Sequence, residues 1–354
     1  MSPSTPSSST KERKKYNELL NSVKLTERIS DIEIEEKLKK LRRLIVLYGI
    51  PTSTPNLRPL VWKLLLKVHD LDSHQYLKLV SKGRSSVADK IRNDASRTLK
   101  SDVEFQRIVG ESKLIRLLDA FAWRTEEKSD GESLYVQGMN VLAAPFLYVQ
   151  PTELEAFNCF SRFIELTCPL YVLPTLEGVH RGLRLVDKCL QIVDNKLYSH
   201  LRRHNLTAEI YAFPCLCRFP LTNTSDKFTA VLTLSACTPP LDQVLCLWDF
   251  LLAFGPHMNV LCVIAQVLLM RDDLLSSSSP MKLLRMFPPL DAQPIISIAV
   301  TLVRDIPEDV SVVANKYLGI PLTTLRYTMI WLDIVLTHGK TIRNVTCRKY
   351  TRTM

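Results

Sequence analysis

Residues 133–152, SLYVQGMNVLAAPFLYVQPT, contain no charged side chain and are about long enough to cross a lipid bilayer. Polar or helix-breaking residues interrupt the stretch at Gln137, Gly138, Asn140 and Pro145. This pattern favours a helix buried inside a large α-helical domain over a membrane span, and no transmembrane segment is predicted. A second uncharged stretch, residues 250–270, is interrupted in the same way and has the same interpretation.

The sequence around these stretches has a helical rhythm. Apolar residues recur at helical spacing over residues 19–47, 61–68, 89–98, 111–123, 140–149, 153–167, 178–194, 243–254 and 259–269. Thr152 is a predicted N-cap, because Glu155 follows it three residues later in a capping box. No set of segments alternates with the period of two that marks strands. The predicted fold is therefore all-α, with many short helices.

Changes in composition divide the chain into successive parts. Residues 1–15 are rich in Ser, Thr and Pro and are predicted to be a disordered leader. Residues 16–48 are predicted to be an outer helical segment, and residues 49–310 the main domain. Residues 311–354 form a divergent basic tail. The first residues lack the apolar segment of a secretory signal, so a cytosolic or nuclear protein is the default expectation.

The formal net charge of +10 belongs to the two ends of the chain. Residues 1–50 carry 11 basic and 7 acidic side chains and residues 311–354 carry 7 and 1, whereas residues 51–310 carry 28 of each. A basic surplus raises the hypothesis of a helical nucleic-acid-binding protein. The electroneutral middle argues against a nucleic-acid partner, because phosphate binding needs a basic surface.

The cysteines and histidines do not predict a metal site. The nine cysteines lie mostly in apolar surroundings and form no Cys-x-x-Cys pair, which is typical of reduced thiols that serve as small apolar side chains. His200 and His204 have a spacing that can bind a metal. Arg202 and Arg203 lie between them, so an exposed polar helix end is the favoured interpretation.

Motifs of several enzyme classes are absent from the sequence. There is no Gly-x-Ser-x-Gly, P-loop, Gly-x-Gly-x-x-Gly or His-Glu-x-x-His, which excludes the common serine hydrolases, P-loop NTPases, dinucleotide enzymes and zincins. The chain is therefore not expected to hold a nucleotide or a cofactor of its own.

Residues 91–97, IRNDASR, place an apolar, an acidic and a basic residue at intervals of three. Such residues are neighbours along one side of a helix. Ile91 can anchor that side in the core while Asp94 orients the guanidinium of Arg97, which reduces the rotamer freedom that a projecting arginine would lose. Considered alone, the pattern is more often that of a surface ion pair.

Residues 135–140, YVQGMN, place an amide side chain at the start of the uncharged helix. Residues two apart on a helix face nearly opposite ways, so Tyr135 is expected to be buried while Gln137 points outward. Gly138 would allow close approach of the backbone. Considered alone, Gln137 is more often a helix-capping amide.

Taken together and in order, these segments resemble the TBC domain, the all-helical GTPase-activating module for Rab-type small GTPases. The resemblance covers about residues 49–310 and is carried by residues matching its motifs: Arg58, Trp62, Ile91, Asp94, Arg97, Tyr135, Gln137, Trp248 and Asp249. It implies that Arg97 and Gln137 act as arginine and glutamine fingers on a partner small GTPase, which itself binds GTP and Mg²⁺. The residues that the resemblance implies as support are Arg58, Trp62, Ile91, Asp94, Tyr135 and Gly138.

Residues 135–146, 178–180 and 236–241 further resemble the fungal mitotic-checkpoint branch of this family. That branch implies a subunit that works with a scaffold partner at the spindle pole and restrains mitotic exit or septation. The sequence departs from the branch at residues 216–231, a polar insertion that is either a surface loop or a translated intron. The alternative function is a non-catalytic adaptor that docks a GTPase or scaffold.

Overall fold

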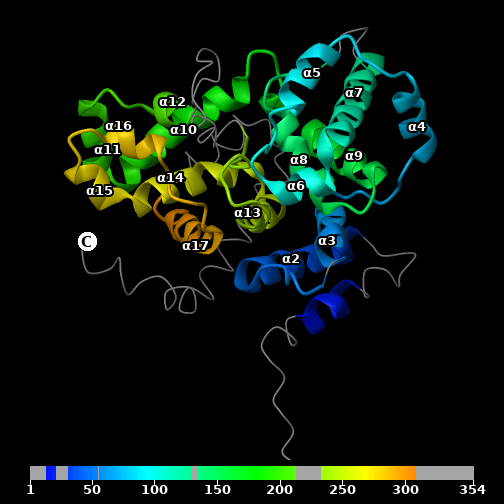
Figure 1. The fold of residues 1–354 in the computed structure, drawn as a ribbon. Helices are drawn as coiled ribbons and strands as arrows, with labels where there is room; N and C mark the ends of the chain where they lie inside the picture. The colour runs from blue at the N-terminus through cyan, green and yellow to red at the C-terminus, as the bar shows by residue number, and fades with distance from the viewer. Residues whose placement is uncertain (1–12, 21–30, 55, 129–133, 213–232, 308–354) are drawn as a thin grey trace, which may run out of the picture.

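The structure, a computed structural model, describes residues 13–20, 31–54, 56–128, 134–212 and 233–307. Within these ranges every regular element is a helix (Figure 1), which confirms the predicted all-α fold. Most of the predicted leader, the insertion at 216–231 and the tail at 311–354 lie outside the described residues.

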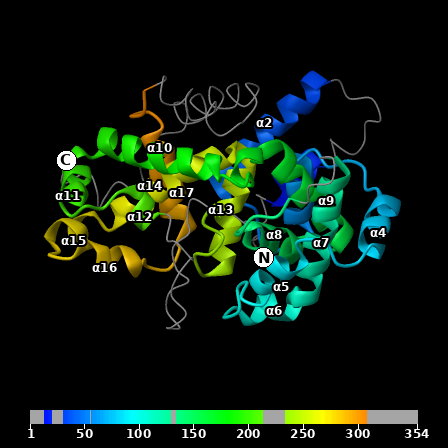
Figure 2. The same cartoon turned by 90° about the horizontal axis from the view of Figure 1, so that it is seen from above.

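The N-terminal half is built around one long central helix. Its helices are α2 (Asp31–Tyr48), α3 (Leu57–Leu65), α4 (Ser73–Ser81), α5 (Ala88–Ala95), α6 (Val103–Ile108), α7 (Gly110–Lys128), α8 (Met139–Val149) and α9 (Glu153–Arg162). Helix α7 contacts α4, α5, α6, α8 and α9. These helices form the blue to green half of the molecule in Figures 1 and 2.

The C-terminal half is a second group of short helices. It contains η1 (Phe163–Thr167), η2 (Pro169–Tyr171), α10 (Glu177–Val193), α11 (Asn195–Arg203), α12 (Ala208–Tyr211), α13 (Leu241–Phe254), η3 (Pro256–Met258), α14 (Asn259–Leu269), α15 (Arg271–Ser276), α16 (Pro280–Arg285) and α17 (Ala292–Leu302). Helix α14 packs between α10 and α17, and α13 contacts α17, α2 and α3. Helix α13 therefore joins the two halves.

An aromatic cluster fills the junction between the halves. Trp62 of α3 stacks on Trp248 of α13 with ring centroids 6.2 Å apart. Phe146 of α8 meets both rings edge-on, at 5.6 Å from Trp62 and 5.5 Å from Trp248. All three side chains are almost completely buried, so α8, which comes from the uncharged stretch at residues 133–152, lies in the core. No helix in the described part of the chain is long and apolar enough to span a membrane.

Two local predictions can be compared directly with the structure. The hydroxyl of Thr152 accepts a hydrogen bond from the backbone N–H of Glu155, which confirms the predicted N-cap. The helix predicted over 153–167 is not one α-helix. It ends at Arg162 and continues as a wider π-helical turn, because the N–H of Cys168 bonds to the carbonyl of Phe163 five residues earlier.

Residues 233–237 form turns. Leu234 and Ser235 both have positive φ, 50° and 61°, and this backbone cannot belong to a right-handed helix. The carbonyl of Leu234 accepts the indole N–H of Trp248. The turn is therefore fixed against α13.

Candidate functional site

The turn that follows helix α5 presents Arg97 to solvent, and the helix before it is anchored in the core. Ile91 is completely buried, and Asp94, one turn later, is also buried. Arg97 follows the last turn of α5, where its backbone N–H bonds to the carbonyl of Asp94 at 3.3 Å. The guanidinium donates through Nη2 to Asp94 Oδ1 at 2.5 Å, while 48% of the Arg97 side chain stays exposed. Ile91 and Asp94 lie on α5 as the spacing predicts, whereas Arg97 lies in the turn beyond the end of the helix, which was expected to continue to residue 98.

Gln137 occupies the corner of a β-turn that precedes α8. The N–H of Met139 bonds to the carbonyl of Val136 at 3.2 Å, and Gly138 has φ 99° and ψ −20°. These values match the third position of a type II turn, which favours glycine. The turn, and not opposite faces of a helix, therefore separates buried Tyr135 from half-buried Gln137. The predicted helical geometry at Tyr135 and Gln137 is wrong, although the expected burial of Tyr135 is correct.

Asp94 joins the arginine segment to the glutamine segment. Its Oδ2 accepts a hydrogen bond of 2.8 Å from the hydroxyl of Tyr135, while Oδ1 accepts Arg97. Burial, followed by the neighbouring Asp94 carboxylate, raises the pKa of Tyr135 far above its usual value. The phenol therefore stays protonated and remains a donor. Both oxygens of one buried carboxylate are occupied, each by a different finger segment.

A second set of hydrogen bonds reinforces this junction. Asn140 Nδ2 donates to Thr98 Oγ1 at 2.8 Å and to the carbonyl of Asp94 at 3.4 Å. Its Oδ1 accepts the backbone N–H of Gly138 at 3.2 Å. The Thr98 hydroxyl in turn donates to the Asp94 carbonyl. The sequence analysis assigned no role to Thr98 or Asn140. Asn140 could have been found, because a polar amide within an uncharged, buried helix needs hydrogen-bond partners.

Arg58 and Trp62 lie in a separate buried cluster around Asp249. The guanidinium of Arg58 bonds to both carboxylate oxygens, at 3.0 Å each for the shortest contacts. The indole N–H of Trp62 donates to Asp249 Oδ1 at 2.7 Å. Burial works to lower the pKa of Arg58, but the charge and hydrogen bonds of Asp249 outweigh it and raise that pKa. The cluster joins α3 to α13.

The cluster and the finger site are connected through α8. Phe146 near the end of α8 packs on Trp62, while the start of α8 carries Asn140 and the Gln137 turn. The structure therefore brings Ile91, Asp94, Arg97, Tyr135 and Gly138 into one site. It places Arg58 and Trp62 in the core that supports α8.

The described residues contain no group of three or more metal-ligating side chains. The rings of His200 and His204 are 4.8 Å apart. Burial raises the pKa of the Cys159 thiol to about 12, so this thiol stays protonated at neutral pH.

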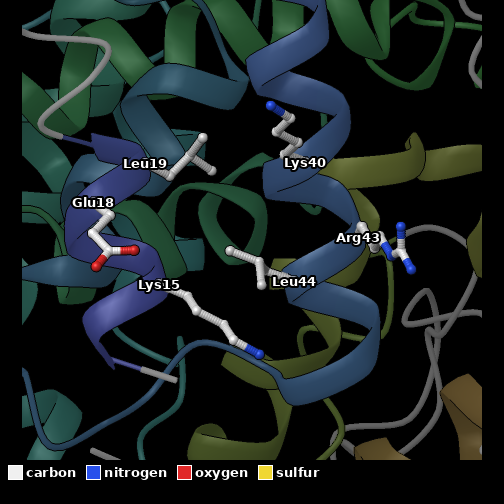
Figure 3. A pocket seen from close by; sticks show the side chains of 6 residues that line it. All are labelled: Lys15, Glu18, Leu19, Lys40, Arg43 and Leu44. Carbon is white, nitrogen blue, oxygen red and sulfur yellow. The ribbon is translucent and has the colours of Figure 1, made fainter. Parts of the chain in front are cut away.

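A surface pocket lies away from the finger segments, between residues 13–20 and α2 (Figure 3). Leu19 and Leu44 form its apolar part, and Lys15, Lys40 and Arg43 supply positive charge. Tyr16 is completely buried beside it and donates to the carbonyl of Gly49 at 2.8 Å. This bond holds residues 13–20 against the domain.

The sequence model of the Rab-GTPase-TBC domain matches residues 55–275, and the chain belongs to this family of proteins. Cell division control protein 16 of Schizosaccharomyces pombe is 43% identical over 275 residues, which cover 77% of this chain and 85% of that relative. Mitotic check point protein BUB2 of Saccharomyces cerevisiae is 38% identical over 291 residues, which cover 78% of this chain and 90% of the relative.

A solved structure shares the fold. The crystal structure of the Ypt/Rab-GAP domain of Gyp1p superposes with a TM-score of 0.62 at 18% sequence identity. The match covers 83% of this chain and 98% of that chain. At this identity the likeness concerns the fold alone.

Proposed function

We propose that this chain is a GTPase-activating protein for a Rab/Ras-like small GTPase, with Arg97 and Gln137 acting in trans. The observation that carries the proposal is the shared carboxylate of Asp94, which holds exposed Arg97 through one oxygen and Tyr135 of the glutamine turn through the other. Family membership supports the choice of a small GTPase as the partner.

Arg97 would neutralise charge that develops on the γ-phosphoryl group. Guanidinium has five N–H donors, and the contact with Asp94 is made through Nη2. Donors remain for phosphate oxygens, while Asp94 restricts the rotation of the side chain. An arginine supplied in trans is worth about 10³–10⁵ in hydrolysis rate, or about 4–7 kcal/mol of barrier.

Gln137 would position the attacking water. An amide can accept from the water through its oxygen and donate through its nitrogen. Gln137 lies at the corner of the turn that Gly138 completes with its positive φ, a position from which the amide would face the partner. GTP and Mg²⁺ would be bound by the partner, and this chain would supply no cofactor.

The cellular part of the proposal comes from the relatives. Their names, cell division control protein 16 and mitotic check point protein BUB2, describe cell-cycle proteins. We infer that this chain restrains mitotic exit or septation as the catalytic subunit of a two-component activator, with a scaffold partner. Its expected place is the cytoplasm, at the spindle pole.

The experiment is single-turnover hydrolysis by a panel of purified Rab-type GTPases loaded with radiolabelled GTP, with and without the full chain. The proposal predicts acceleration of at least one GTPase by about 10³ or more. Binding to the GTP form without acceleration of any GTPase would contradict it and favour the adaptor. Stimulation that appears only when a purified scaffold is added would support the two-component form.

A further inference from the structure

We propose that Val103 is a docking residue for the GTPase, held beside the arginine finger by Gln106. The inference rests on the proposed function and adds a contact that none of the predicted site residues supplies. Val103 is the first residue of α6 and is 82% exposed, the largest fraction among the exposed large hydrophobic residues of the described chain. Single exposed valines are common on protein surfaces. The exposure of Val103 is informative because the residue lies next to the turn that carries Arg97.

Helix α6 is fastened to the turn that carries Arg97. The amide of Gln106 donates to the carbonyls of Thr98 at 3.0 Å and Leu99 at 3.3 Å. Leu99 has a φ of 44°, a left-handed conformation that persists for leucine only when the surroundings enforce it. Gln106 is one of the groups that does so. The turn after Arg97 and helix α6 are therefore joined by these hydrogen bonds.

The packing of α6 also fixes the direction of Val103. Phe105 is almost completely buried and stacks on Tyr148 of α8, with ring centroids 6.5 Å apart. Asp102 caps the helix by accepting the N–H of Phe105 at 2.8 Å. Residues two apart on a helix face nearly opposite ways, so burial of Phe105 directs Val103 to solvent.

A GTPase that brings its γ-phosphate to Arg97 must cover the surface around that side chain. Helix α6 begins six residues after Arg97 and is bonded to the same turn. An apolar side chain at this place would leave water when the partner docks, and removal of apolar surface from water favours association. Val103 would therefore contribute to binding of the GTPase and not to the hydrolytic step.

The test uses the full chain and the panel GTPase that binds most tightly, loaded with a GTP analogue that is not hydrolysed. Val103→Ser is expected to raise the dissociation constant about tenfold, equivalent to about 1.4 kcal/mol. Val103→Ile should retain the affinity of the parent chain. With hydrolysable GTP, the single-turnover rate at saturating GTPase should stay within about twofold of the parent rate.

Met286 gives a matched control. It is 68% exposed and follows α16, in the other half of the molecule (Figures 1 and 2). Met286→Ser should leave the dissociation constant unchanged. Val103→Asp gives a second variant, because an acid in the first turn suits a helix, and it should weaken binding at least as much as serine.

Two results would overturn the inference. One is affinity within about twofold of the parent for both Val103→Ser and Val103→Asp. The other is an equal loss of affinity in Met286→Ser. Because binding is measured without hydrolysis, these results would not contradict the proposed catalysis. Conversely, a chain that binds a GTPase through Val103 but does not accelerate hydrolysis would contradict the proposed function and not the role of Val103.

Discussion

Tyr135 donates a hydrogen bond of 2.8 Å to Asp94, a residue 41 positions earlier in the chain. The contact is buried, and the second oxygen of the same carboxylate accepts Arg97. One acidic side chain thus sets the relative position of the turn after α5 and the segment before α8. If Arg97 and Gln137 act on one GTPase, this bond is part of what aligns them.

Loss of the Tyr135 hydroxyl should therefore affect rate more than binding. Tyr135→Phe removes one hydrogen bond to the buried carboxylate, which should cost about 1–2 kcal/mol of unfolding free energy. We expect the single-turnover rate at saturating GTPase to fall about tenfold, because Arg97 loses its fixed orientation. Tyr148→Phe, which keeps the ring stacked on Phe105, is the control and should change neither quantity. A rate for Tyr135→Phe equal to that of the control would contradict the alignment role.

Gln137 should matter for rate and not for stability. Its side chain is half-buried, and among the described residues it has no hydrogen-bond partner, so Gln137→Ala should leave the thermal midpoint unchanged. We expect the single-turnover rate to fall about 100-fold or more, since a positioned proton-transfer group is typically worth about 10²–10⁴ in rate. The fall should be smaller with a GTPase whose own glutamine can position the water. An unchanged rate with every responsive GTPase would remove Gln137 from the mechanism.

The Arg58–Asp249 pair should control folding. Arg58→Ala would leave the completely buried Asp249 carboxylate without its charge partner, which should cost about 3–5 kcal/mol in urea unfolding. The double variant Arg58→Met with Asp249→Asn removes both charges and keeps an acceptor for Trp62. It should be more stable than Arg58→Ala. The reverse order of stability would show that the ion pair is not what Arg58 contributes.

His257 should make the fold sensitive to mild acid. Burial lowers its pKa from 6.5 to about 4, and its Nδ1 is buried without a hydrogen-bond partner among the described residues. The unfolded chain therefore binds more protons between these two values, so stability is complete above pH 6.5 and declines as the pH falls toward 4.

At about pH 5, the protonation of His257 should lower the free energy of unfolding by about 2 kcal/mol relative to neutral pH. Urea midpoints measured at both values would detect it. His257→Gln should flatten the difference, because glutamine does not titrate. An equally steep pH dependence in the variant would assign the acid sensitivity to other groups.

The sequence was most informative where spacing alone defines neighbours. The three-residue intervals of Ile91, Asp94 and Arg97 require only a helical segment. Helix α5 supplies it for Ile91 and Asp94, and the turn after the helix, where the N–H of Arg97 bonds to the carbonyl of Asp94, keeps Arg97 next to that acid. The cap at Thr152 is equally local. The two buried stretches were predicted because an uncharged run with polar interruptions is rarely compatible with a surface helix.

Contacts between distant segments could not be predicted in this way. Arg58 and Trp62 bond to Asp249, about 190 residues later in the chain. Helical periodicity describes only local spacing and cannot predict these bonds. The turn at Gln137 was missed because Gly138 was interpreted as permitting close approach, whereas its positive φ makes it a turn residue. The hydrogen bond from Gln106 to the carbonyl of Leu99 depends on a left-handed backbone at Leu99. Leucine rarely adopts this conformation, so the contact could not be predicted from the sequence.

The most direct test of the central claim is single-turnover GTP hydrolysis with Arg97→Ala, measured at saturating amounts of the responsive GTPase. Lys100→Ala is the matched control, since Lys100 is an exposed cation in the same turn. We expect Arg97→Ala to lose at least about 100-fold of the acceleration. Its affinity for the analogue-loaded GTPase and its thermal midpoint should remain near those of the parent. Lys100→Ala should retain full activity. Acceleration by Arg97→Ala within about twofold of the parent would contradict the account.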